Sequence, residues 1–143
     1  MTTIPIVLAD AQLAPSYAGI GDAGADLRAA ESTVLAPGAF AIVKTGVKAA
    51  IPDGFVGLVH PRSGLAAKRG VTVLNAPGTI DSGYRGEIGV ILINHSKIEV
   101  GIDQGERIAQ LVVQRVERAE FVVVETLDAT ARGEGAYGST GRS

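Results

Sequence analysis

The chain of 143 residues is predicted to be an all-β protein, a distorted antiparallel jelly-roll barrel with one short helix. Short runs rich in Val and Ile recur along it, bounded by Gly, Pro, Asp or Asn, as is typical of many short strands. The helical segments that a parallel sheet needs between its strands are missing. A barrel or sandwich of antiparallel strands within one domain follows from these observations.

The strand and helix signals are placed along the chain as follows. Strands are expected at Ile4–Leu8, Phe40–Ile51, Phe55–His60, Ile88–Asn94, Ile108–Val116 and Phe121–Glu125. A helix is expected over Ser63–Arg69, with Ser63 as a possible N-cap and Gly70 just beyond the last turn. The backbone N–H groups at the start of this helix, beside Arg62, are expected to hold an anion. The apolar Ile108–Val116 run is expected to need covering by a partner.

The last residues differ in composition from the rest of the chain. Ala131–Ser143 is rich in Gly, Ser and Arg and has no apolar face to fold against. We therefore expect residues 1–130 to form the barrel and residues 131–143 to form a flexible, Gly-rich arm. Arg132 and Tyr137 would give such an arm a cation and an aromatic ring for a ligand, whereas composition alone is also compatible with an idle terminus.

Composition limits the classes of function. Hydrophobic residues make up 46% of the chain, as in globular proteins, and the net charge of −2 disfavours binding along a nucleic-acid backbone. Without cysteine there is no thiolate metal site, and two histidines, His60 and His95, are too few for a histidine-rich zinc centre. No apolar run approaches the ~20 residues of a membrane-spanning helix, and the N-terminus has no signal-peptide pattern. We expect a soluble, cytoplasmic protein that binds neither nucleic acid nor membrane.

Two segments combine glycines with reactive side chains that turn formation alone does not require. Pro61–Ala66, with the sequence PRSGLA, places Arg62 and Ser63 beside a glycine, which suits a phosphate chain. Asn75–Glu87, with the sequence NAPGTIDSGYRGE, holds a carboxylate, a phenol and an arginine. Hydrolysis at a phosphate needs a base that receives a proton from water, and Asp81 is the candidate. The alternative is that both segments are plain surface turns.

Five motifs occur in a fixed order from near the N-terminus to the last residues. They are AGADL at Ala23–Leu27, PRSGLA at Pro61–Ala66, GTIDSGYRGE at Gly78–Glu87, GERIAQ at Gly105–Gln110 and RGEGAYGSTG at Arg132–Gly141. In this order and spacing, and over essentially its whole length, the chain resembles the homotrimeric deoxyuridine triphosphatase (dUTPase) family. The resemblance implies hydrolysis of dUTP to dUMP and pyrophosphate, Mg²⁺ bound mainly by the triphosphate and water, and a homotrimer whose active sites are shared between subunits.

The resemblance also implies roles at the phosphate chain. A water activated by Asp81 would attack the α-phosphate. Arg62 and Gln110 would bind the phosphates, and Ser63 would donate to the oxygen that bridges the α- and β-phosphates. Asp26 would reach the Mg²⁺ through water, because this ion keeps several waters and commonly contacts a protein through one carboxylate.

Further residues are implied to recognise the nucleoside and to close the site. Asn75 would bind the uracil edge, and the Tyr84 ring would exclude a ribose 2′-hydroxyl. Arg132 would contact the terminal phosphate, and Tyr137 would stack on the uracil. The remaining substrate contacts implied by the motifs are Gly64, Thr79, Ile80, Gly138 and Ser139.

The chain departs from the family pattern at several positions. Many members carry Tyr at the position of Ala25, a longer residue at that of Gly89 and Gly at that of Ala136. Most carry Phe as the stacking aromatic of the arm, where this chain has Tyr.

Arg85 and Glu87 are expected to be structural and could pair across a subunit boundary.

Two alternative functions remain open from the sequence. A deoxycytidine triphosphate deaminase shares the fold, but it would need a glutamate as the deamination base in place of the TIDSGY segment. A catalytically silent nucleotide-binding or regulatory module is the second alternative, and such a module has no use for Asp81 as a base.

Overall fold

A computed structural model of the chain describes residues 2–135. The strands are β1 Ile6–Leu8, β2 Gly24–Arg28, β3 Thr33–Leu35, β4 Phe40–Ala49, β5 Phe55–Pro61, β6 Val71–Val73, β7 Gly78–Ile80, β8 Glu87–Asn94, β9 Val100–Ile102 and β10 Arg107–Arg115. The helices are the 3₁₀ turn η1 Ala11–Leu13 and the α-helix α1 Ser63–Arg69. Within these residues, the predicted all-β class with one short α-helix is confirmed.

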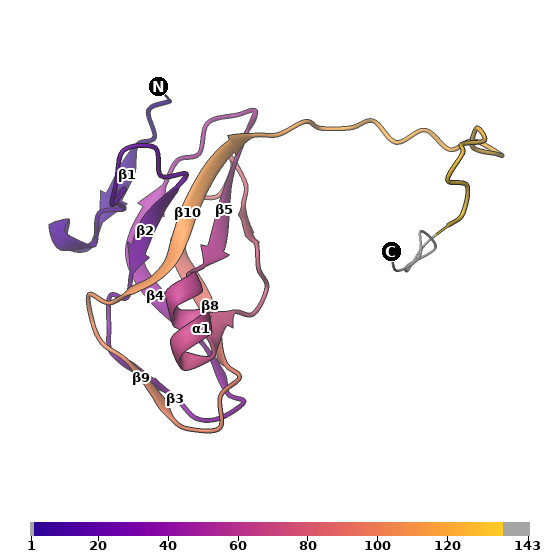
Figure 1. Cartoon of the computed structure of the whole chain (residues 1–143). Coiled ribbons are helices and arrows are strands. Elements are labelled where there is room, and N and C mark those ends of the chain that lie inside the picture. The colour runs from indigo at the N-terminus through magenta and orange to yellow at the C-terminus, as the bar shows by residue number, and fades with distance from the viewer. Residues whose placement is uncertain (1, 136–143) are drawn as a thin grey trace.

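The strands form two four-stranded sheets and one two-stranded sheet, and every pairing is antiparallel (Figure 1). The strand orders are β1-β4-β8-β6, β2-β10-β5-β7 and β3-β9. Alternate residues of β8, including Val90 and Leu92, are buried, as are Val59 of β5 and Leu111 of β10. Because these residues belong to one hydrophobic cluster, the two large sheets share a single core.

Most of the longer predicted elements are confirmed, the helix with its predicted bounds and the strands with bounds that differ by one or two residues. They are β1, β4, β5, β8 and β10, together with the helix Ser63–Arg69. The strand predicted at Phe121–Glu125 is wrong, because the last strand ends at Arg115 and the chain then extends away from the sheets (Figure 1). Phe121 and Val123 are 93% and 99% exposed, so the segment has strand-like composition without a neighbouring strand among residues 2–135.

The sequence did not predict the five shortest strands apart from β1. They are β2, β3, β6, β7 and β9, each of three to five residues. Runs of this length contain too few residues for a visible alternation of apolar and polar side chains. Three of them exist as neighbours of a longer strand, β2 beside β10, β6 beside β8 and β7 beside β5, while β3 and β9 pair with each other.

The helix has the predicted bounds, but its N-cap residue differs from the prediction. Arg62, not Ser63, is the N-cap, with extended backbone angles (φ −96°, ψ 126°) and no side-chain capping bond. The reason is that β5 runs through Pro61 almost directly into the helix, so that Ser63 is already helical. Gly70 ends the helix in the left-handed conformation at φ 66°. Within residues 2–135, no helix is long and apolar enough to cross a membrane.

A wide bulge interrupts β4 where it pairs with β8. Three residues, Thr45–Val47, lie opposite the single residue Ile88. The buried Thr45 hydroxyl donates a hydrogen bond of 2.6 Å to the Ile88 carbonyl and so replaces a missing ladder bond. Gly46 has φ 69°, and a Cβ there would lie 2.5 Å from the Leu13 side chain, so only glycine fits. The bulge therefore fixes the start of β8 against β4.

The buried Asn94 side chain joins the small β3-β9 sheet to the rest of the fold. Its amide donates to the carbonyls of Leu35 (2.9 Å) and Ile98 (2.8 Å), and its oxygen accepts from the Ser96 N–H (2.9 Å).

Asn94→Ala should therefore lower the free energy of unfolding by about 3 kcal/mol, because buried backbone groups lose their partners. Urea unfolding measures the effect, with the exposed Lys97→Ala as the control. Equal urea midpoints for the two variants would contradict this role.

Candidate active site

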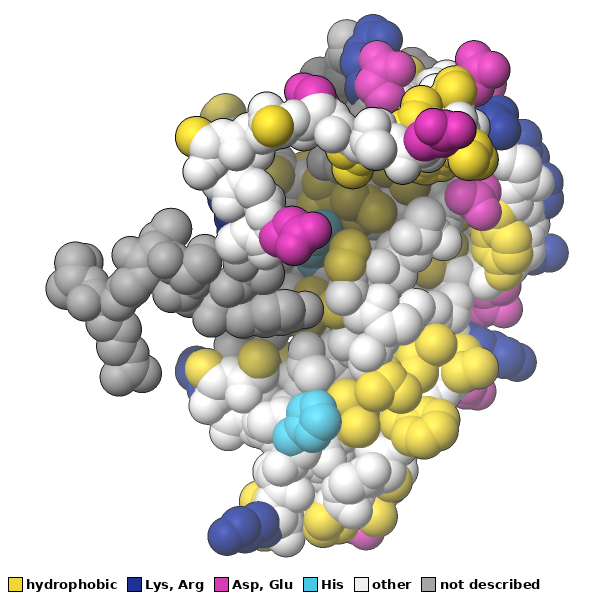
Figure 2. All heavy atoms as spheres, turned by 90° about the vertical axis from the view of Figure 1, so that its right-hand side faces the viewer, with side chains coloured by type: hydrophobic (Ala, Val, Ile, Leu, Met, Phe, Trp, Pro, Cys, Tyr) yellow, Lys and Arg dark blue, Asp and Glu magenta, His cyan; other side chains and the backbone are white. Residues whose placement is uncertain are grey.

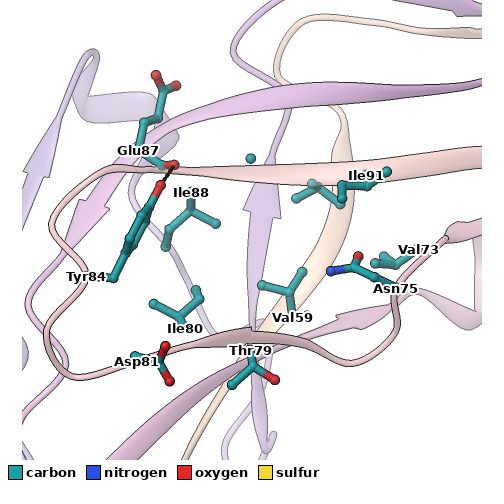
Figure 3. A pocket seen from close by; sticks show the side chains of 13 residues that line it. Val59, Val73, Asn75, Thr79, Ile80, Asp81, Tyr84, Glu87, Ile88 and Ile91 are labelled. Carbon is teal, nitrogen blue, oxygen red and sulfur yellow. Dashed lines mark hydrogen bonds between the residues drawn. The ribbon is translucent and has the colours of Figure 1, made fainter.

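A cavity opens between β7 and the start of β8, where the GTIDSGYRGE motif folds back on itself (Figure 3). Ile80 and Ile88 form part of its apolar wall. Asn75 lies at one end of the cavity, and Asp81 and Tyr84 lie at the other (Figure 3). An apolar cavity with a few polar groups at its rim is the usual form of a small-molecule site.

The strand β7 explains how the motif presents these groups. Its residues alternate, so that Gly78 and Ile80 are buried while Thr79 is exposed at the cavity. Asp81 follows the strand end and is exposed. A Cβ at Gly78 would lie 3.4 Å from the side-chain amide nitrogen of Asn75, so Asn75 lies directly against the strand backbone.

Tyr84 closes one side of the cavity. Its side chain is 46% exposed, and its hydroxyl donates a hydrogen bond of 2.9 Å to the Glu87 carbonyl (Figure 3). The backbone N–H of Tyr84 also bonds the Asp81 carbonyl at 3.1 Å, which closes the intervening turn. The ring and the Asp81 carboxylate are thus presented from the two ends of one turn.

A second cluster surrounds the buried carboxylate of Asp26 on β2, which is 4% exposed. Its oxygens contact Arg62 Nε and Arg107 Nη1, each at 3.2 Å, and accept a hydrogen bond of 3.4 Å from Gln110. Arg62 also donates to the Arg107 carbonyl at 3.2 Å. Two guanidinium groups around one carboxylate leave a net positive charge, which suits an anion such as a phosphate.

Strand register brings this second cluster together. On β10, Gln110 lies opposite Asp26 of β2 on one side and His60 of β5 on the other. Arg62 follows two residues after His60, so it emerges beside the same carboxylate. A Cβ at Gly24 would lie 2.9 Å from the Gln110 Cβ, and the glycine therefore makes room for Gln110.

Ser63 and Gly64 extend the second cluster into solvent. Both are exposed in the first turn of α1, directly after Arg62. Among the described residues, a Cβ built at Gly64 meets no atom within 4 Å apart from its chain neighbours and its own helix backbone, so the backbone there is open to a ligand. Arg107 is a candidate that the sequence analysis missed. Its place in the GERIAQ motif was visible, but its contact with Asp26 depends on the register of β2 and β10.

The two clusters do not meet in a single chain. Arg62, Ser63 and Gln110 do not line the cavity formed by Asn75, Asp81 and their neighbours. Arg132 is exposed on the segment beyond β10, where its Nε donates to the Gly135 carbonyl at 3.0 Å. The remaining arm residues singled out from the sequence, Ala136, Tyr137, Gly138 and Ser139, lie outside the described residues.

The other positions noted in the sequence have simple surroundings. Ala25 is buried, and a Cβ at Gly89 would lie 2.7 Å from the exposed Ile42 side chain, which limits longer residues there. The Glu87 carboxylate accepts a hydrogen bond of 2.8 Å from the Gly46 N–H. The Arg85 guanidinium donates to two carbonyls of its own turn. His60 lies on β5, and His95 directly follows the end of β8.

Known proteins resemble the chain over nearly all of its length. A family model described as dUTPase matches residues 11–141. The deoxyuridine 5′-triphosphate nucleotidohydrolase of Thermobifida fusca (strain YX) is 60% identical over 128 residues, which cover 89% of this chain and 72% of that protein. The enzyme of the same name from Corynebacterium glutamicum is 54% identical over 145 residues, which cover 100% of this chain and 97% of that protein.

Solved structures agree with these relatives. The Staphylococcus bacteriophage 80alpha dUTPase with dUPNHPP has a TM-score of 0.90 at 30% identity, covering 99% of this chain and 100% of that one. A mutant dUTPase of S. aureus phage phi11, described with a structural Mg(II) ion, has a TM-score of 0.81 at 28% identity, covering 90% and 100%. The predicted jelly-roll fold is confirmed by these likenesses. The chain belongs to the dUTPase family.

Proposed function

We propose that this chain hydrolyses dUTP to dUMP and pyrophosphate. The observation that carries the proposal is the cavity with an amide at one end and the Asp81 carboxylate at the other, in a chain that also carries a cationic cluster around Asp26. The cavity suits a nucleoside and the cluster suits a phosphate chain.

The cavity accounts for recognition of a deoxyuridine. The Asn75 amide offers one acceptor and two donors, which complement the uracil edge. Cytosine replaces the 4-oxo acceptor with an amino donor and would leave a polar group of the site unpaired, so it is rejected. The Tyr84 ring packs against the deoxyribose, and a ribose 2′-hydroxyl is refused by steric clash.

The chemical step joins the two clusters. Asp81 accepts a proton from water as the water oxygen forms a bond to the α-phosphorus. The bond from that phosphorus to the oxygen bridging the α- and β-phosphates breaks, and pyrophosphate leaves. Ser63 donates a hydrogen bond to the departing bridging oxygen, while Arg62 and Gln110 bind the phosphates and stabilise the charge that develops there. Arg107 adds a further positive charge beside Arg62.

The residues at the site fit a metal ion that the substrate carries. Within residues 2–135, no group of three or more His, Cys, Asp or Glu side chains is placed to hold a metal. The carboxylate at the cationic cluster is Asp26, which would contact water molecules of a Mg²⁺ bound mainly by the triphosphate. When bound, this ion would neutralise part of the phosphate charge.

Association into a homotrimer would unite the two clusters. In the proposed site, one subunit supplies Arg62, Ser63 and Gln110, a second supplies Asn75 and Asp81, and a third supplies the arm. The separation of the two clusters within one chain supports this arrangement.

The surface also supports association. Hydrophobic side chains gather on the face toward which the segment after β10 extends (Figure 2). The exposed large hydrophobic residues include Phe40, Ile42, Phe121, Val122, Val123, Val124 and Leu127. So much exposed apolar surface is unusual for a monomer, and a second copy of the chain would cover it.

The arm would complete the site over the bound nucleotide. We place Arg132 at the γ-phosphate and Tyr137 on the uracil ring, with Gly138 and Ser139 as further contacts. A closed arm excludes water from the phosphates and fixes the triphosphate for attack.

Pyrophosphate release from dUTP, UTP, dTTP and dCTP tests the proposed reaction. The protein should release pyrophosphate from dUTP far faster than from the others, without ammonia from dCTP.

Asp81→Asn should lower turnover by roughly 10²–10⁴, because an amide cannot accept the proton, while a non-hydrolysable dUTP analogue should still bind. Turnover of this variant within a factor of two of the parent would remove Asp81 from the mechanism, and ammonia release would favour a deaminase.

Asp26→Asn separates a positioning role from a role through the metal ion. If the carboxylate orients Arg62 and Arg107, the variant should lose roughly 10²-fold in kcat/KM at every Mg²⁺ concentration, because the cations are misplaced. Glu31→Gln removes the same charge from an exposed position and is the control. Activity that returns to the parental value at high Mg²⁺ would show that Asp26 acts only through the metal.

Deleting residues from Arg132 onward tests the arm. No described strand is removed, so the fold and the oligomer should persist in circular dichroism and light scattering. Turnover should fall tenfold or more, because the truncated protein lacks a positioning cation and the stacking ring. Full activity of the truncated protein would make the arm an idle terminus.

A further inference from the structure

The Tyr84 ring lies directly on Gly86. A Cβ built at Gly86 would lie 2.6 Å from the ring Cζ and 2.9 Å from Cε2, and it would overlap the hydroxyl oxygen as well. Real Cβ atoms do not approach other atoms this closely. The ring therefore occupies its place on the cavity wall only because residue 86 has no side chain.

The hydroxyl end of the ring is held by a second contact. It donates to the Glu87 carbonyl at 2.9 Å, and the carboxylate of the same Glu87 accepts from the Gly46 N–H at 2.8 Å. Gly46 belongs to the β4 bulge, which only glycine can form at that position. The acceptor of the Tyr84 hydroxyl is thus tied to the rigid sheet rather than to the loop alone.

We propose that Gly86 and Glu87 form a seat for Tyr84, and that both are positioning residues for the choice between deoxyribo- and ribonucleotides. The inference rests on the proposed role of Tyr84 at the sugar. An exposed tyrosine in a turn has several rotamers, and a mobile ring would yield to a 2′-hydroxyl. With Gly86 beneath it and Glu87 at its tip, the ring resists displacement, so the extra hydroxyl meets a fixed wall.

Gly86→Ala should displace the ring without disturbing the core. The atoms that the new methyl group would meet are the far end of a side chain that is 46% exposed, so the ring can turn toward solvent. Asp81 lies at the other end of the turn and should keep its place. Selectivity at the sugar is then lost while hydrolysis of dUTP continues.

The experiment compares kcat/KM for UTP and dUTP in Gly86→Ala and in Gly83→Ala. A Cβ at Gly83, in the same loop, meets no atom of residues 2–135 within 4 Å apart from its chain neighbours, so this variant is the matched control. The UTP-to-dUTP ratio should rise about tenfold in Gly86→Ala, as for a lost steric contact in a pocket, and stay at the parental value in Gly83→Ala. Equal ratios in the two variants would overturn the seat.

Tyr84→Ala and the double variant Tyr84→Ala/Gly86→Ala distinguish the positioning role of Gly86 from the role of the Tyr84 ring in excluding the 2′-hydroxyl. If Gly86 acts through the ring, the double variant should show the same ratio as Tyr84→Ala alone. A ratio that is raised in Tyr84→Ala but parental in Gly86→Ala would overturn the seat. The proposed role of the Tyr84 ring against a 2′-hydroxyl would then still stand. A parental ratio in Tyr84→Ala would overturn both, while dUTP hydrolysis by the parent would still stand.

Two substitutions test the role of the Glu87 carboxylate, one conservative and one that removes the side-chain acceptor. Glu87→Gln keeps an oxygen that can accept from the Gly46 N–H, whereas Glu87→Ala does not. The UTP-to-dUTP ratio should rise in Glu87→Ala and stay near the parental value in Glu87→Gln. Thermal unfolding of both variants checks that the fold is retained. A parental ratio in Glu87→Ala, or an equal rise in both variants, would remove the Glu87 carboxylate from the seat.

Discussion

The pairing of β10 with β2 on one side and β5 on the other is the constraint on which the proposed phosphate side of the site depends. It places Asp26, Gln110 and Arg62 at one point of the sheet. Burying a carboxylate is costly unless its charge is neutralised, and here two guanidinium groups do so at 3.2 Å. The ion cluster therefore stabilises the sheet register and, at the same time, holds the cations that would bind a triphosphate in the proposed function.

The sequence predicted the parts of the fold that depend on local pattern. Long strands such as β8 are Val- and Ile-rich runs bounded by turn residues, and the helix before Gly70 carries its own stop signal. Phe121–Glu125 has the same composition without being a strand, because a strand also needs a neighbour. Arg107 was missed for a similar reason, since its contact with Asp26 exists only through strand register. The motifs identified the cavity residues, and the separation of these residues from Arg62 within one chain agrees with the shared active sites that the resemblance implied.

That separation has a physical consequence for how the protein would operate. Each chain folds with its nucleoside cavity and its cationic cluster apart, so neither half alone can place Asp81 at a phosphate held by Arg62. The exposed apolar surface and the Phe121–Glu125 segment, which has no strand partner among residues 2–135, would provide a driving force for the proposed association. In the proposed trimer, the hydrophobic effect that assembles the subunits would also assemble the catalytic groups, so activity would depend on assembly.

Several side chains of the site pack against backbone at glycines of the strands and the loop. Gln110 lies over Gly24, Asn75 lies against Gly78, and the Tyr84 ring lies on Gly86. A Cβ at any of these glycines would come within 3.4 Å of the functional side chain, so the backbone itself determines where each group can stand. A side chain that packs against backbone has fewer rotamers open to it than one that packs against another mobile side chain. The backbone therefore adds to the support that core residues such as Ile80 and Ile88 give the site, although the site lies at the surface.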